Sequence, residues 1–318
     1  MTFNVPHVDV RAKLAALEGQ DIKDPSDWPT RERILKRHKD GKQLNGLTLP
    51  WSKTHDKIRL RPGEVSVWGG YNGHNKSTVL SQVATWAARG TKVGVGSFEM
   101  ELEDTYNLMA QQAAGTDKTD SRWVNDFCTW CEDRIFVYDI LEAIPSDQVL
   151  SGVDHMAGTL GCGLIIIDSL RMVRGIVDDM EKEADFLTLV TGLAKYYQTH
   201  IALVHHVKKP ERGEQQIPDK YALRGNAAIS DLAHSVFLTW SNKELKELRR
   251  KHFEGEPMSA EEKAKLSKDA EKADQLLIVA KQRHAPFEGH VGLWQHESRQ
   301  FLGSSKKQPM LIDIPRLA

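Results

Sequence analysis

A glycine-rich turn, a lysine and two hydroxyl residues stand together in the stretch VSVWGGYNGHNKSTVLSQ. Three of its residues match fixed positions of the phosphate-binding pattern GxxxxGK(S/T), namely Gly70, Lys76 and Ser77, and Gly73 is a further glycine inside the loop. The backbone amides of such a loop point at phosphate oxygens, and the positive end of the following helix adds to the attraction. We expect Lys76 to pair with the β and γ phosphates of a nucleotide and the Ser77 hydroxyl to ligate Mg²⁺.

Asn75 departs from this pattern, which has glycine immediately before the lysine. Glycine serves where φ is positive or where a backbone must approach closely, and asparagine tolerates the left-handed region better than most residues. The substitution is expected to cost about 1 kcal/mol and to bring a side chain near the phosphates. His74, Asn75 and Thr78 complete the predicted nucleotide-binding set. The competing interpretation is a glycine-rich turn with an incidental lysine.

A carboxylate ends the apolar stretch CGLIIIDSL, at Asp168. A carboxylate at the carboxyl end of a buried strand, next to a phosphate loop, can hold Mg²⁺ through water. A lone strand that ends in aspartate is common, but together with the loop it predicts a site for ATP, or another NTP, with Mg²⁺ bound by Ser77 and Asp168.

Short apolar segments alternate with helical segments from residue 61 onward. Strands rich in Val and Ile are predicted at 63–70, 92–98, 133–139, 163–170, 200–207 and 234–240. Helical patterns lie between most of them, including 76–90 and 101–115. This alternation favours an α/β fold with a mostly parallel, twisted sheet and helices on both faces. Residues 275–303 predict a C-terminal β ribbon, and 243–273 a charged, solvent-exposed helical hairpin.

The first 50 residues are polar and predict two short amphipathic helices, too few and too charged to form a core of their own. We therefore expect residues 1–50 to be a helical arm or linker and residues 51–318 to be one domain.

The net charge of −1 over 318 residues gives no global attraction to nucleic acid or anionic lipid, so a polyanion site must be local. No apolar run is long enough to span a membrane, and the amino terminus lacks the apolar core of a secretory signal. Three cysteines form no disulfide framework, which fits a reducing compartment and a cytoplasmic location. The single CxxC of Cys128 and Cys131 has no second pair to complete a zinc site.

The order of the motifs resembles the RecA-like motor domain of hexameric replicative helicases: the DnaB family and, more closely, the helicase half of phage primase–helicases. Five patches carry the resemblance across residues 50–302: LRPGEVSVWGGYNGHNKST, VGSFEMELEDT, LIIIDSLRMV, LVHHVKKPERG with ALRGNAAISDLAHSVFLTW, and LLIVAKQRHAP. It implies a RecA-like P-loop NTPase core without a primase domain, at work in a bacterial cytoplasm or that of a phage-infected host. The arm would dock on an adjacent subunit.

The resemblance also implies roles for single residues. Glu99, directly after the second strand, takes the place of the catalytic glutamate that polarises the attacking water. His206 takes the place of the residue that senses the γ phosphate, with His205 beside it. Arg283 would be the arginine finger that enters a neighbouring subunit's pocket, accompanied by Lys281. Apart from the resemblance, the position of Trp240 after VFLT makes it a candidate to stack on the adenine, although a strand-end tryptophan is more often part of a core.

Basic residues between the sensing strand and the next helix would line the ring pore and hold the backbone of single-stranded DNA. The residues implied are Lys208, Lys209, Arg212, Lys220, Arg224, Gly225 and Asn226. Arg171 and Arg174, in the loop after Asp168, would face the same channel. The competing interpretation is a solvated loop, since acidic residues dilute its charge.

These inferences predict a ring-forming, ATP-dependent DNA helicase or translocase that acts in replication. Its partners would be single-stranded DNA, further copies of itself in a homo-hexamer, and a separate primase or polymerase. Two alternatives stay open: a RecA-like recombinase or strand-exchange ATPase, which would form open filaments, and a non-hydrolysing, nucleotide-gated DNA-binding or loader protein with a degenerate loop. Asn75 is the main support for the second alternative.

Overall fold

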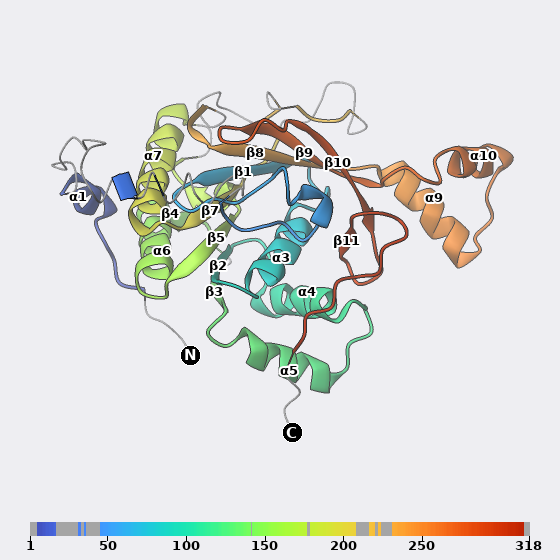
Figure 1. Ribbon diagram of the computed structural model, residues 1–318, viewed down its shortest axis with the longest axis horizontal. Coiled ribbons are helices and arrows are strands. Elements are labelled where there is room, and N and C mark those ends of the chain that lie inside the picture. The colour runs from blue at the N-terminus through green and yellow to red at the C-terminus, as the bar shows by residue number, and fades with distance from the viewer. Residues whose placement is uncertain are drawn as a thin grey trace.

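The computed structural model describes residues 5–16, 31–32, 35, 45–140, 142–176, 179–207, 216–219, 222–223 and 231–314. Within these residues one large sheet carries its strands in the order β11-β10-β9-β8-β1-β7-β5-β2-β3 (Figure 1). The bounds are β1 Val65–Gly70, β2 Lys92–Ser97, β3 Ile135–Asp139, β5 Cys162–Asp168, β7 His200–Val204, β8 Ser235–Ser241, β9 Gln275–Gln282, β10 Gly289–Gln295 and β11 Phe301–Leu302. A separate parallel pair joins β4 Ile144–Pro145 to β6 Val173–Arg174.

The strands from β8 to β3 in this order are all parallel, so their carboxyl ends meet at one edge of the sheet. Both faces of the central strands are covered: every residue of β1 and of β7 is buried. Burial on two sides is why these segments are continuous apolar runs and show little alternation.

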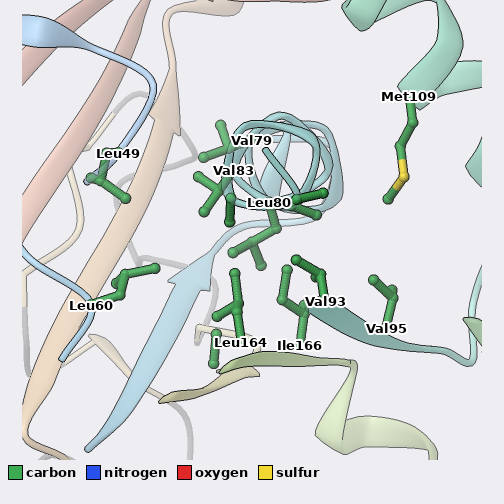
Figure 2. Close-up of a cluster of buried hydrophobic side chains, with 14 of the residues drawn as sticks. Leu49, Leu60, Val79, Leu80, Val83, Val93, Val95, Met109, Leu164 and Ile166 are labelled. Carbon is green, nitrogen blue, oxygen red and sulfur yellow. The ribbon is translucent and has the colours of Figure 1, made fainter. Parts of the chain in front are cut away.

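Helices cover the two faces of the sheet as the sequence predicts (Figure 1). One face carries α3 Lys76–Ala87, α4 Leu102–Ala114 and α5 Ser121–Cys131, and the other carries α6 Ser146–Gly158 and α7 Met180–Tyr197. In Figure 2, Leu80 of α3 points down toward the strand residues around Ile166 of β5. Its neighbours in the strand, Ile165 and Ile167, belong to the core on the α6 and α7 face. β5 thus contributes alternate residues to two separate cores.

The predicted C-terminal ribbon continues the main sheet. β9 pairs antiparallel with β8, β10 with β9, and β11 with β10. Between β8 and β9 the charged segment forms α9 Lys243–Glu254 and α10 Ala260–Lys268, which extend away from the body (Figure 1). Arg249 anchors this hairpin through a 2.6 Å ion pair with Asp274.

The first helix of the predicted arm, α1 Val10–Ala15, packs on α6 and α7 of its own chain. Lys13 makes a 2.7 Å ion pair with Asp154, and Leu14 packs against Gly192. Most of the second predicted arm helix lies outside the described residues. Leu49 is fully buried in the core shared with α3, so the packed body begins before the predicted boundary at residue 51.

A short 3-10 helix, η1 Ser52–Thr54, follows this entry segment, and a second, η2 Leu170–Met172, follows β5. Among the described helices none is both long and apolar enough to cross a membrane.

Candidate functional site

A cavity of about 520 Å³ opens where the parallel strands end. This edge of a doubly covered α/β sheet is where such folds bind ligands, and the volume lies in the range of small-molecule sites. Loops after four strands and the start of α3 contribute to its wall. The lining residues are Asn72, Gly73, Asn75, Lys76, Ser77, Thr78, Glu99, Arg171, Met172 and His206.

The phosphate loop runs from the end of β1 to the first residue of α3. Gly73 has φ 73° and Asn75 has φ 64°, so the departure from glycine occupies the left-handed conformation expected for asparagine. The Asn75 side-chain amide donates a 2.8 Å hydrogen bond to Gln275 on β9. The first amides of α3 have no partner one turn earlier in the helix and belong to residues that line the cavity, an arrangement that favours an anion.

Lys76 is buried, and its ammonium group donates to the carbonyl oxygens of Gly70 (3.0 Å) and Tyr71 (3.1 Å). Burial lowers the pKa of Lys76, and the nearby carboxylates of Asp168 and Glu99 oppose that shift. The ammonium group therefore lies in the field of both carboxylates.

Asp168 ends β5 beside Ser77, whose hydroxyl is its hydrogen-bond partner. Burial raises the pKa of Asp168 to about 6; the Ser77 bond works against this shift and the Glu99 charge adds to it. A hydroxyl and a poorly solvated carboxylate are oxygen ligands of the kind Mg²⁺ takes, with water and substrate phosphates filling the other positions. The residues present thus fit a magnesium ion held by Ser77 and Asp168.

Glu99 belongs to a hydrogen-bonded group in the wall of the cavity. Its Oε1 accepts a 2.5 Å bond from the Ser169 hydroxyl and lies 3.4 Å from Nε2 of His206. The other ring nitrogen of His206, Nδ1, lies 2.9 Å from Oδ1 of Asn72. The His206 contact, followed by the Ser169 bond, lowers the pKa of Glu99 to about 2 against the opposing effect of burial.

Sequence reasoning missed Ser169 and Asn72. Ser169 directly follows Asp168, and that position could have indicated it. Asn72 occupies a variable position of the loop, where residue type gives no signal.

His74 and Trp240 lie apart from the cavity. His74 is buried under the loop, where Nδ1 accepts a 3.0 Å bond from the Ser241 amide and the ring packs edge-on against Tyr71. Trp240 packs against the core on the α6 and α7 face of the sheet, opposite α3. Gly70 has a packing role, since a Cβ there would meet the Thr239 side chain at 2.5 Å.

Arg283 and Lys281 lie at the opposite edge of the sheet from the cavity. In the β8–β9 ladder Gln275 pairs with Ser241 near the phosphate loop, and Gln282 pairs with Ser235 at the far end. Six residues of strand separate the two ends by about 20 Å. Lys281 donates to the Asp231 carbonyl (3.0 Å), and the exposed Arg283 guanidinium donates to the same oxygen. Neither cation reaches the cavity of its own chain.

The two arginines that follow Asp168 line different cavities. Arg171 lines the nucleotide-sized cavity, whereas Arg174 lines a second cavity of about 560 Å³ between α1, α6 and α7. The other residues expected to bind DNA lie outside the described residues: Lys208, Lys209, Arg212, Lys220, Arg224, Gly225 and Asn226.

Residues 44–212 match the family model described as an AAA domain. The chain is 26% identical over 210 residues to the DNA helicase/primase of Enterobacteria phage T3; the match covers 59% of this chain and 37% of that protein. The chain therefore spans little more than a third of that relative's length.

Two solved structures have a similar fold. One is described as an ATPase domain and has a TM-score of 0.66 at 13% identity, covering 88% of this chain and 99% of that one. The other, a DnaB-like replicative helicase solved in a study of its interactions with primase, has a TM-score of 0.63 at 13% identity, covering 92% of this chain and 71% of that one. These findings confirm the α/β, RecA-like fold class and the resemblance to replicative helicase motor domains.

Proposed function

This chain belongs to the AAA domain family, and from that premise we propose that it is a Mg²⁺-dependent NTPase motor that moves on single-stranded DNA. One observation carries the proposal. Four strand ends bring Lys76, Glu99 and His206 to the wall of one cavity, with Ser77 and Asp168 beside them. A lysine, two carboxylates and a polar sensor at a phosphate-sized loop form the set that NTP hydrolysis needs.

The proposed roles follow from position. Lys76 and the first amides of α3 bind the phosphates, and Ser77 with Asp168 would hold Mg²⁺, which when bound neutralises charge on the phosphates. Glu99 orients and polarises the attacking water. Because the His206 contact is the main cause of the low Glu99 pKa, its loss when His206 turns toward a terminal phosphate would make Glu99 more basic.

The proposals of DNA binding and of ring assembly rest on other observations than the proposal of NTP hydrolysis. The phage T3 relative is named a DNA helicase/primase, and one of the two similar folds is that of a DnaB-like replicative helicase. Arg283 is exposed at the edge away from its own cavity, which is the placement that a cation acting on a neighbouring copy requires. We therefore propose a ring, of six subunits by family likeness, that unwinds duplex DNA with a separate primase or polymerase as partner.

ATP hydrolysis with and without single-stranded DNA tests the proposal. We expect DNA to stimulate hydrolysis, Lys76→Ala to abolish it, and the exposed α10 variant Lys263→Ala to leave it unchanged. A forked duplex with a labelled strand reports unwinding in the same samples. An ATP hydrolysis rate that is unchanged by single-stranded DNA and by Lys76→Ala would contradict the proposed function.

A further inference from the structure

His205, the neighbour of the proposed sensor His206, has no assigned role, yet it is buried and both of its ring nitrogens have partners. Nδ1 lies 2.7 Å from the backbone carbonyl oxygen of His206. Nε2 lies 2.9 Å from Oε1 of Glu183, a buried residue in the first turn of α7. Strand β7 ends at Val204, so these contacts hold the chain just beyond its last strand residue.

The partners fix where protons must lie. A carbonyl oxygen only accepts, so Nδ1 of His205 must carry a hydrogen and donate it to His206. Nε2 faces a carboxylate oxygen, so a proton lies between His205 and Glu183, carried either by the ring or by the carboxyl group. In both arrangements Glu183 fixes the ring, and the ring holds the His206 peptide.

The other side of His206 faces the nucleotide cavity. Its Nδ1 contacts Asn72 of the phosphate loop at 2.9 Å, and its Nε2 lies 3.4 Å from both Glu99 and Ser169. A small rotation of the His206 peptide would therefore change the contact with Glu99. The same chain then continues through Val207, which bridges to Leu223.

We propose that Glu183 and His205 form a positioning clamp that sets the orientation of His206 toward Glu99 and the terminal phosphate. The proposal rests on the proposed NTPase function. It assigns to α7, on the far face of the sheet from α3, a direct connection to the hydrolytic site. Neither Glu183 nor His205 touches the substrate, so both act through His206.

The test compares two substitutions of Glu183 with a matched control. Glu183→Gln keeps an amide that can donate to Nε2 of a neutral His205, whereas Glu183→Leu has a similar reach without a polar group. Glu181→Gln changes an exposed carboxylate in the same turn and serves as control. Thermal unfolding and binding of a fluorescent ATP analogue establish that each variant is folded.

We expect Glu183→Leu to lower kcat about 10-fold to 100-fold with little change in the KM for ATP, since small misplacements of catalytic groups have effects of this size. Glu183→Gln should keep at least about a third of the wild-type kcat, and Glu181→Gln should match the wild type. A folded Glu183→Leu variant with unchanged kcat overturns the clamp, as does equal loss in the Gln and Leu variants.

A spectroscopic readout stands apart from activity. Nitrogen-15 NMR of the histidine rings in the wild-type protein should show His205 Nδ1 protonated at neutral pH, with the assignment made by loss of the signal in His205→Gln. An unprotonated Nδ1 overturns the clamp even where Glu183→Leu fails to fold. If the wild-type protein hydrolyses no ATP, the proposed function fails, and the ring measurement still decides whether the clamp exists.

Discussion

Asn75 and Gln275 are joined across the phosphate loop by a 2.8 Å hydrogen bond from the asparagine amide to the glutamine carbonyl oxygen. Gln275 also donates to the backbone carbonyl of His74, at 3.4 Å. The residue that departs from the glycine pattern is thus attached to β9, with its backbone already in the left-handed region at φ 64°. Its side chain is engaged by the protein, which argues against a loop that has lost its shape.

Replacing Asn75 tests this interpretation. Asn75→Gly removes the Gln275 bond but suits the positive φ, so we expect kcat within about 3-fold of wild type and a change in stability under about 1 kcal/mol. Asn75→Ala forces a Cβ into the left-handed region with no compensating bond and should cost about 1–2 kcal/mol. Chemical denaturation and ATPase assays measure both. Hydrolysis that appears only in Asn75→Gly would instead support a non-hydrolysing loader protein.

Glu99→Gln should separate binding from hydrolysis. The amide oxygen can still accept from Ser169, so this part of the cavity wall keeps its shape, but an amide cannot take a proton from water. We expect kcat to fall about 10²-fold to 10⁴-fold while ATP binding stays within a few-fold. Rapid-quench hydrolysis measures kcat, and equilibrium nucleotide binding measures the affinity for ATP. Turnover near the wild-type rate would remove Glu99 from the mechanism.

The convergence of Lys76, Asp168 and Glu99 was predictable because each lies at or soon after the end of an apolar strand, and parallel strands bring their carboxyl ends together. The contacts within the site were not. Asn72 and Ser169 act through side-chain geometry, which depends on how the loops close over the sheet. His74 is a loop residue whose ring turns inward to Ser241, a contact between segments far apart in sequence.

Strand register explains where Trp240 lies, and a short helical turn explains where Arg171 lies. A shift of one residue in strand register would move Trp240 to the other face of the sheet. In the structure Trp240 lies on the face that α6 and α7 cover. The basic charge of Arg171 and its place after Asp168 predict a contact with DNA, whereas the short η2 turn brings Arg171 to the cavity beside the phosphate loop. Charge alone could not distinguish a contact with DNA from a place in this cavity.

Arg171 should therefore affect nucleotide more than DNA. We expect Arg171→Ala to raise the KM for ATP about 3-fold to 30-fold, as for loss of a charged contact to a phosphate, with a smaller effect on single-stranded DNA affinity. Arg174→Ala, which changes an exposed arginine of β6 that lines the other cavity, is the matched control. Fluorescence anisotropy with labelled DNA and with a labelled ATP analogue measures the two affinities. A larger loss of DNA affinity than of nucleotide affinity in Arg171→Ala would instead support a role of Arg171 in DNA binding.

Asp168 should make the metal-free protein less stable as pH rises. Its pKa of about 6 lies above the ordinary value of 3.8, so the folded chain holds the proton more tightly than the unfolded chain. The resulting stability is full below about pH 4 and is lost as pH rises through about 6. Asp168→Asn should accordingly raise the free energy of unfolding by about 1–3 kcal/mol at pH 7.5 and by much less at pH 4.

Thermal or chemical unfolding at the two pH values, in the presence of a chelator, measures this difference. Added Mg²⁺ should stabilise the wild type at pH 7.5 and have a smaller effect on Asp168→Asn. Equal stabilities of the two proteins at pH 7.5 would show that burial of the Asp168 charge carries no cost.

Arg283 gives the sharpest test of assembly, because its edge of the sheet lies about 20 Å from the cavity of its own chain. If the guanidinium serves a neighbouring copy, Arg283→Ala and Lys76→Ala should each abolish DNA-stimulated hydrolysis alone. Mixed in one assembly, they should recover part of it. At interfaces where a Lys76→Ala subunit donates its intact Arg283 to the intact loop of an Arg283→Ala subunit, a complete site forms. Light scattering confirms that the mixture assembles. Full activity of Arg283→Ala alone, or no recovery in a mixed assembly of normal size, would exclude a cation supplied in trans by Arg283.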